Sequence, residues 1–155
     1  MPTVSDASPL IALAAIDRLE LLPALFGAVV IPPAVLAEIA PSIPVPAAWM
    51  RLQPLAQSQP TRIATSGLGA GEREALSLGL ELRAERVILD DNAARQLARQ
   101  SGLPVVGTLG VLLAAKRNGL LERVRPALDD LRAARFFMAP RLYNSVLQIA
   151  QEADT

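Results

Sequence analysis

Residues 86–106, RVILDDNAARQLARQSGLPVV, contain the pattern that decides the fold. A short apolar run at 86–89 predicts a buried strand, and the amphipathic stretch at about 92–100 predicts a helix. A second apolar run follows at 104–106. A strand, a helix and a strand joined by short turns form a crossover unit, in which the two strands are parallel. This stretch therefore predicts part of a parallel sheet.

The same alternation of short apolar runs and helical patterns extends along the rest of the chain. Further strands are expected at 3–6, 28–31 and about 51–55, and helices at about 9–15, 17–25, 32–40, 46–50, 71–83, 109–118, 124–134 and 140–152. We expect Ser8 to cap the first helix, with Pro9 in its first turn. The predicted fold class is α/β, a three-layer α/β/α sandwich with a central parallel sheet. With no repeat and no linker, residues 1–155 are expected to form a single domain.

The composition restricts the chemistry of any active site. The chain has neither histidine nor cysteine, which excludes serine-histidine triads, thiolate nucleophiles and zinc sites built from those residues. Its 15 Asp and Glu residues offer oxygen ligands, which suit Mg²⁺ or Mn²⁺. A chain without cysteine fits the reducing cytoplasm, where we expect the protein. The uncharged stretch 21–37 contains three prolines, so we expect a buried core segment there and no membrane span.

Acidic residues at the carboxyl ends of parallel strands are the first candidates for a ligand site. Asp6 follows the first expected strand, and it has no capping task because Ser8 is the expected helix cap. Glu38 is the only polar side chain between Pro32 and Ala40. A carboxylate among apolar residues is costly to bury without a partner, so we expect a cation near Glu38.

Two acidic pairs each leave a choice between a functional and a structural residue. At helical spacing, Glu72 falls within the apolar arc of its helix and Glu74 on the polar side, so we expect Glu72 to be functional and Glu74 to be solvated. Asp90 and Asp91 lie between a strand and a helix, where one of them is expected to cap the helix. Spacing alone does not decide which one. The candidate catalytic and metal-binding residues are Asp6, Glu38, Glu72, Asp90 and Asp91.

Basic and hydroxyl residues accompany these acids. Arg73, Arg95 and Arg99 are either contacts to a nucleic-acid backbone or ordinary surface residues. Ser8 and Thr108 each follow a strand, where a hydroxyl orients a water or a phosphate, or caps a helix. Carboxylates that hold one or two divalent cations promote attack of a metal-bound water on a phosphodiester. That reaction requires no histidine.

Five blocks in this order resemble PIN-domain proteins, of the compact prokaryotic branch related to VapC-type toxins. The blocks are VSDASPLIAL (4–13), VVIPPAVLAEI (29–39), GAGEREALSLGLEL (69–82), VILDDNAARQLA (87–98) and VVGTLGVLLAAKRNGLL (105–121). The resemblance covers about residues 3–135 and implies a PIN-like α/β/α sandwich with a Mg²⁺- or Mn²⁺-dependent ribonuclease site. Its acids would be Asp6, Glu38, Glu72 or Glu74, and Asp90 or Asp91.

The resemblance also implies partners. RNA would be the substrate, and many such toxins pair with an antitoxin that covers the acidic cleft, or form homodimers. The apolar C-terminal helix with Leu142, Val146, Leu147 and Ile149 would serve such a contact or complete the core. The alternative is a catalytically inactive PIN-fold module that binds RNA or a protein. A phosphoacceptor receiver domain is disfavoured because its acidic pair would follow the first strand, and Gly67, Gly69 and Gly71 do not form a dinucleotide-binding motif.

Overall fold

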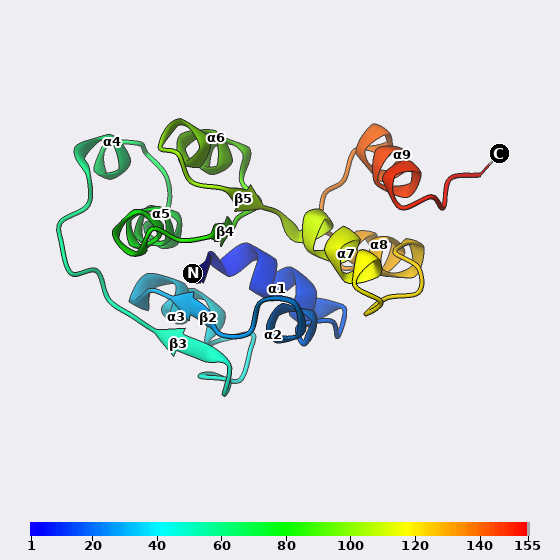
Figure 1. Ribbon diagram of the computed structural model, residues 1–155, viewed down its shortest axis with the longest axis horizontal. Coiled ribbons are helices and arrows are strands. Elements are labelled where there is room, and N and C mark those ends of the chain that lie inside the picture. The colour runs from blue at the N-terminus through cyan, green and yellow to red at the C-terminus, as the bar shows by residue number, and fades with distance from the viewer. Residues whose placement is uncertain (155) are drawn as a thin grey trace.

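The computed structural model describes residues 1–154, and a five-stranded parallel sheet forms the centre of that part of the chain (Figure 1). The strands are ordered β3-β2-β1-β4-β5, and every neighbouring pair is parallel. The strands are β1 (Thr3–Ser5), β2 (Val29–Ile31), β3 (Met50–Leu52), β4 (Arg86–Ile88) and β5 (Val105–Val106). The helices are α1 (Ala7–Ala15), α2 (Leu21–Phe26), α3 (Pro33–Ile39), α4 (Thr61–Ala64), α5 (Ala70–Leu82), α6 (Asn92–Gln100), α7 (Thr108–Arg117), α8 (Arg125–Ala133) and α9 (Pro140–Ile149).

Helices cover both faces of the sheet. Helices α5 and α6 lie on one side, α1, α2 and α7 lie on the other, and α8 and α9 lie beyond α7 (Figure 1). Helix α3 packs against both α1 and α5, and α4 packs against α5. This arrangement confirms the predicted α/β/α sandwich with a parallel central sheet. Within the described residues, no helix is long and apolar enough to cross a membrane.

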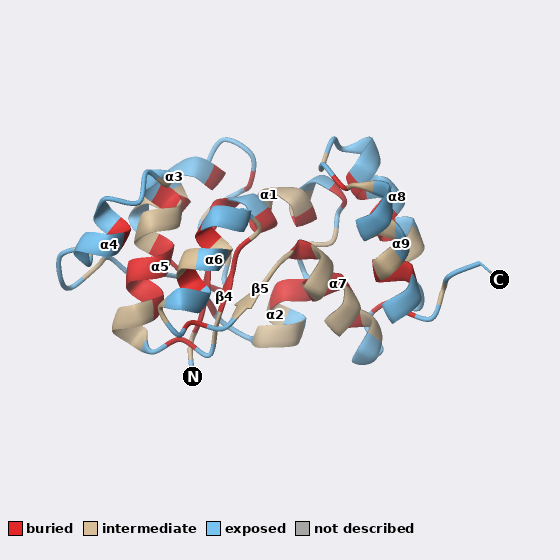
Figure 2. Cartoon of the chain, turned by 90° about the horizontal axis from the view of Figure 1, so that it is seen from above, coloured by how far each residue is buried: buried red, intermediate tan, exposed pale blue. Residues whose placement is uncertain are grey.

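The buried residues gather at the sheet and on the inward faces of the helices, whereas the outer faces of α4, α6, α8 and α9 are exposed (Figure 2). All three residues of β1 and of β2 are buried, as continuous apolar runs are when helices cover both faces of a sheet. Gly79 permits the close approach of α5 to β4, because a Cβ there would lie 2.9 Å from Val87 Cγ2. Helix α5, which carries Glu72, therefore packs directly on the sheet.

The order of the strands places two candidate acids side by side. The chain proceeds outward from β1 to β2 and β3, and then returns to form β4 on the other side of β1. Ligands of open parallel sheets bind beyond the carboxyl ends of the strands at such a switch point. Asp6 leaves β1 there with its backbone N–H 3.0 Å from Ile88 O. Asp90 leaves β4 two residues later.

The first helix begins at Ala7 instead of Pro9, so the prediction that Ser8 caps it is wrong. The cap position belongs to Asp6, whose side chain makes no capping hydrogen bond. Ser8 is exposed in the first helical turn. Proline is tolerated anywhere in that turn because its first N–H groups have no helical partner, so Pro9 did not fix the start of the helix. Asp6 is free of a capping task, although not because Ser8 performs it.

The segment before β3 also differs from its prediction. Residues 46–50 form no helix, because Trp49 O accepts a hydrogen bond from Val29 N at 3.0 Å and draws the backbone to the edge of β2. The strand then ends at Leu52, before Pro54, which has no N–H to donate to a sheet. Helix α4 was not predicted from this proline-rich segment.

Two other helices are shorter than predicted. The helix expected at 17–25 begins at Leu21, because Asp17 has a φ of 56° and separates it from α1. The helix expected at 140–152 ends at Ile149, and Gln151 turns the chain with a φ of 61°. This turn directs the side chain of Glu152 back into the protein.

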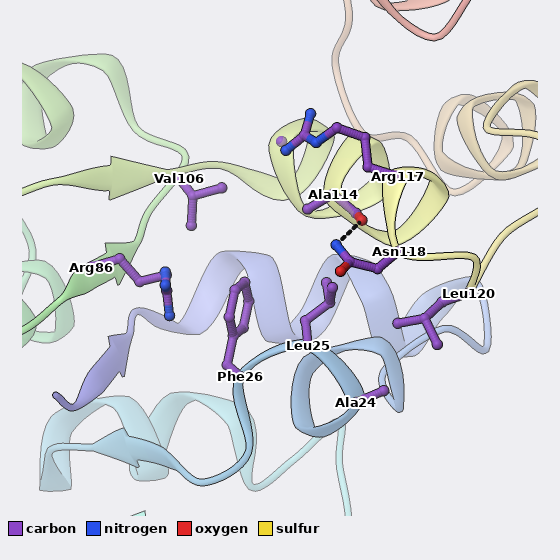
Figure 3. Close-up of a pocket in the computed structure, with 10 residues that line it drawn as sticks. Ala24, Leu25, Phe26, Arg86, Val106, Ala114, Arg117, Asn118 and Leu120 are labelled. Carbon is purple, nitrogen blue, oxygen red and sulfur yellow. Dashed lines mark hydrogen bonds between the residues drawn. The ribbon is translucent and has the colours of Figure 1, made fainter.

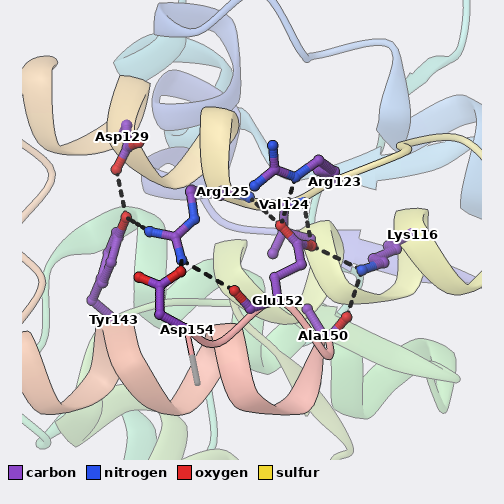
Figure 4. A network of polar contacts seen from close by, with 9 residues as sticks. All are labelled: Lys116, Arg123, Val124, Arg125, Asp129, Tyr143, Ala150, Glu152 and Asp154. Carbon is purple, nitrogen blue, oxygen red and sulfur yellow. Dashed lines mark hydrogen bonds and ion pairs between the residues drawn. The ribbon is translucent and has the colours of Figure 1, made fainter.

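Glu152 ties the C-terminal residues to α7 and α8 (Figure 4). Its side chain is only 5% exposed and accepts hydrogen bonds from Lys116 Nζ at 2.9 Å, Val124 N at 2.7 Å and Arg125 N at 3.1 Å. Burial by itself would raise the pKa of Glu152, but these hydrogen bonds and the charge of Lys116 outweigh burial, so the pKa lies below its ordinary value. The buried carboxylate of Glu152 therefore stabilises the packing of the C-terminal residues against α7 and α8. It lies away from the end of the sheet where Asp6 and Asp90 follow their strands.

Candidate metal centre

Asp90 is held in a fixed position beside Asp6. Its Oδ1 accepts a hydrogen bond from Thr108 N at 2.8 Å, and its Oδ2 accepts one from the Thr108 hydroxyl at 2.6 Å. The bare backbone of Gly107 makes room for this arrangement, because a Cβ there would lie 2.8 Å from Asp90 Oδ1. The start of α7 therefore orients the acid that follows β4. Thr108 is fully buried and caps no helix.

Glu38 and Asp6 approach each other over Gly71. A Cβ at Gly71 would overlap Glu38 Oε1 and would lie 3.4 Å from Asp6 Oδ1. The two carboxylates thus reach the same point of the first turn of α5, from the end of α3 and from the end of β1. Glu38 itself is exposed, which corrects the expectation of a carboxylate buried among apolar residues.

Glu72 extends the cluster from the same turn of α5. Its Oε1 accepts a hydrogen bond from Gly69 N at 3.0 Å, so the side chain also helps to cap its own helix. Burial raises the pKa of Glu72, the Gly69 amide opposes the rise, and the charges of Asp91 and Glu38 add to it. Glu72 is therefore in electrostatic contact with acids from two other elements.

One member of each acidic pair makes a structural contact to the start of a different helix. Asp91 is the cap of α6, with its Oδ2 2.9 Å from Ala94 N, and Asp90 is the member that Thr108 orients. The expectation that Glu74 is solvated is wrong. Its Oε1 accepts a hydrogen bond from Ala34 N at 3.1 Å in the first turn of α3, where an unpaired N–H requires a partner.

Asp6 is the most perturbed acid of this group. It is only 3% exposed, and burial is the largest cause that raises its pKa to about 7. The Ala7 backbone N–H acts against this rise. The negative charges of Glu72, Glu38 and Asp90 strengthen it. Carboxylates from α3, α5 and the segment after β4 therefore all act against a negative charge on Asp6.

Within residues 1–154, no lysine or arginine forms an ion pair within 4.0 Å of any of the five candidate acids, and Arg95 acts on Asp90 only through its charge. The ion-pair partner expected beside Glu38 is therefore not present among these residues. Arg95 donates to Leu89 O at 2.9 Å; burial and nearby Arg99 lower its pKa, whereas the negative charge of Asp90 acts to raise it. Arg73 has a buried Nε without a partner, and Arg99 is exposed on α6.

The donor set fits a hard divalent cation. All of its ligand atoms are carboxylate oxygens, and the bare backbone of Gly71 lets two of them converge. As the side chains stand in the described residues, no three of these acids enclose a metal position. Thr108 fixes the side chain of Asp90. To complete a coordination shell, the longer side chains of Glu38 and Glu72 would therefore have to rotate. The residue types of the cluster are thus those that a divalent cation would require as ligands.

Sequence reasoning missed the residues that shape this cluster. Gly71 and Gly107 each leave room for a carboxylate. The sequence feature that could have identified them is a glycine at the start of a helix, directly before Glu72 in one case and before Thr108 in the other. Thr108 was expected either to cap a helix or to orient a water or phosphate, whereas it orients Asp90. Long-range contacts of this kind depend on which strands are neighbours in the sheet.

Comparison with protein families identifies the family of the chain. A family model described as PIN domain matches residues 2–152. The chain belongs to the PIN-domain family. PIN domains are generally nucleases, which hydrolyse nucleic acids and typically use divalent metal ions. No curated protein and no solved structure matches the chain.

Proposed function

We propose that this protein is a Mg²⁺- or Mn²⁺-dependent endoribonuclease, and that it is the toxin of a toxin-antitoxin pair. The observation that carries the proposal is the cluster around buried Asp6, where acids from four elements meet at the switch point of the sheet. No lysine or arginine among residues 1–154 forms an ion pair with them within 4.0 Å. The choice of RNA and the toxin role follow from the resemblance to VapC-type proteins.

Each acid has a distinct part in the proposed site. Asp6 and Asp90 are the fixed ligands, since the sheet holds one and Thr108 holds the other. Glu38 and Glu72 are the adjustable ligands. A bound divalent cation would supply a Lewis acid for the phosphate and a water of lowered pKa. Asp91 is not assigned as a direct ligand, because its side chain caps α6. It acts on Glu72 through its negative charge.

Substrate phosphates need a cation that is not already used by the protein. Arg99 is exposed on α6, one helical turn beyond Arg95, and we assign it the contact with the RNA backbone. Arg95 is less suited to this contact because it already donates to Leu89 O. The antitoxin would cover the acids. The exposed Leu142 and Ile149 of α9 would serve a homodimer or antitoxin contact.

The second candidate is a PIN-fold module that binds RNA or a protein without cutting it. The observation that favours it is that no three acids of the described chain stand in ligating positions. The two candidates differ in one assay. Purified protein is incubated with single-stranded RNA, structured RNA and matching DNA, with Mg²⁺, Mn²⁺ or EDTA. The nuclease cuts RNA only with metal. The module leaves every substrate intact but retains RNA in a filter-binding assay with EDTA present.

A further inference from the structure

A cavity of about 500 Å³ lies between α2 and α7 against the edge of the sheet at β4 and β5 (Figure 3). None of the five candidate acids lines it. It contains Arg86, the first residue of β4, whereas Asp90 follows the opposite end of that strand. A volume of 300–1,000 Å³ is typical of small-molecule sites. The cavity is thus separate from the acidic cluster and large enough for a ligand of its own.

One side of the cavity holds an arginine in a fixed position. The Arg86 guanidinium lies over the Phe26 ring, 4.6 Å from its centroid. It also donates to Thr3 Oγ1 at 2.8 Å and pairs with Glu85 at 2.9 Å. These contacts orient the group before any ligand arrives, so an anion that binds it loses little side-chain entropy in the protein.

The opposite side offers groups without a partner in the structure. Arg117, in the last turn of α7, is exposed and has no hydrogen-bond or ion-pair partner among residues 1–154. Its neighbour Asn118 donates through Nδ2 to Ala114 O at 2.7 Å, which leaves the amide oxygen as an acceptor. Lys116, the other cation of this turn, is already bound to Glu152. This side of the cavity therefore offers the free guanidinium of Arg117 and the free amide oxygen of Asn118.

Apolar walls lie between the two arginines. They come from Leu25 and Phe26 of α2, Val106 of β5, Ala114 of α7, and Leu120. A ligand that satisfies the whole cavity has an anionic group for the Arg117 guanidinium, an apolar part for the walls, and a donor for the amide oxygen. Guanidinium forks suit phosphate oxygens in particular.

We propose that this cavity is a second site that binds a phosphorylated nucleoside, with the phosphate at Arg117 and the base between α2 and the edge of β5. Two sources supply this chemistry, a free mononucleotide and the phosphorylated end of an RNA strand. The proposal does not depend on cleavage at the acidic cluster. It stands on the cavity, its two arginines and its apolar walls.

The test is calorimetric titration of the whole protein with AMP in EDTA, where the acidic cluster repels phosphate. AMP binds saturably, and both inorganic phosphate and adenosine bind at least tenfold more weakly, because each fills half of the site. Arg117→Ala weakens AMP binding about tenfold, which corresponds to about 1.4 kcal/mol. The matched control Arg141→Ala, on exposed α9 and outside the cavity, leaves it unchanged. Absence of saturable AMP binding, or equal loss in both variants, overturns the proposal.

A variant that fills the cavity tests the location independently. Ala114→Phe places a ring in the cavity and abolishes AMP binding, while the circular dichroism spectrum shows that the protein remains folded. AMP binding that survives in folded Ala114→Phe contradicts the proposed position. Oligonucleotides with a 5′-phosphate and with a 5′-hydroxyl distinguish the two sources. Competition with AMP by the phosphorylated strand alone identifies the strand end as ligand, and competition by neither identifies the free nucleotide.

Discussion

Thr108 binds both oxygens of Asp90, one through its backbone N–H at 2.8 Å and the other through its hydroxyl at 2.6 Å. The contact joins Asp90, two residues beyond the end of β4, to the first residue of α7, 18 positions later. Both donors come from one buried residue, so the carboxylate has a single orientation. Thr108 is a positioning residue in this account, because it acts on the metal centre only through Asp90.

Replacing Thr108 with valine tests this role. Thr108→Val removes the hydroxyl donor but keeps the shape and the backbone donor, and we expect Mn²⁺ affinity to fall about tenfold, as the loss of one hydrogen bond to a charged group predicts. Thr108→Ser restores the donor and should return affinity to near the original value. Isothermal titration with Mn²⁺ measures both. Equal affinities of the valine and serine variants would show that the hydroxyl does not position Asp90.

A substitution at Gly71 is expected to change metal binding without lowering the stability of the fold. Gly71→Ala adds a Cβ that overlaps Glu38 Oε1, so we expect weaker metal binding. The melting temperature should not fall, because Glu38 is an exposed, flexible side chain and alanine favours a helix. Gly79→Ala is the matched control in the same helix. Its Cβ meets Val87 at 2.9 Å, so it should lower the melting temperature and spare metal affinity. Thermal unfolding and Mn²⁺ titration of both variants check this contrast.

Asp6 makes the metal-free protein less stable at neutral pH. Its pKa is raised from 3.8 to about 7, so the native state holds the proton more tightly than the unfolded chain. The stability from that difference is fully present below about pH 3.8 and is lost as the pH rises through 7. At pH 8 in EDTA, Asp6→Asn should therefore raise the free energy of unfolding by about 2–4 kcal/mol. Urea denaturation measures it, and a less stable variant would contradict the burial argument.

Glu152 has the opposite pH dependence. Its pKa is lowered in the folded state, so its contribution is fully present above the unfolded value of 4.5 and is lost as the pH falls through the folded one. At pH 7, Glu152→Gln should cost about 2 kcal/mol, because Lys116 Nζ loses its charged partner. The difference from the original protein should shrink below pH 4.5. Asp154→Asn, whose side chain is 95% exposed, is the control and should have no effect. A difference for Glu152→Gln that stays constant with pH would contradict this account.

Local sequence patterns predicted those helices and strands whose ends are set by residues within or next to the element itself. Helix α6 was predicted at its observed bounds, because an acidic cap precedes a strongly amphipathic stretch. The predicted start of α1 failed because Pro9 is compatible with several positions in the first turn. A strand at β3 was predicted, but the helix before it was not found, since pairing with Val29 overrides the local preference.

The candidate site was predictable in its residue types and only partly in its geometry. Asp6 and Asp90 are neighbours because β1 and β4 are adjacent, which is a property of topology. Spacing did not show that Asp91 caps α6 and that Asp90 contacts Thr108, since Thr108 belongs to α7, a later element of the chain. Glu74 was misjudged for the same reason. Its partner is Ala34, 40 residues away in the sequence.

Mn²⁺ titration of the metal-free protein by calorimetry tests the central claim most directly, with Asp6→Asn and Asp130→Asn as matched variants. Asp130 is exposed on α8, away from the sheet edge. We expect saturable binding to the original protein and to Asp130→Asn, and binding at least tenfold weaker to Asp6→Asn. If all three proteins bind Mn²⁺ equally, or none binds it, the acids around Asp6 are not a metal centre.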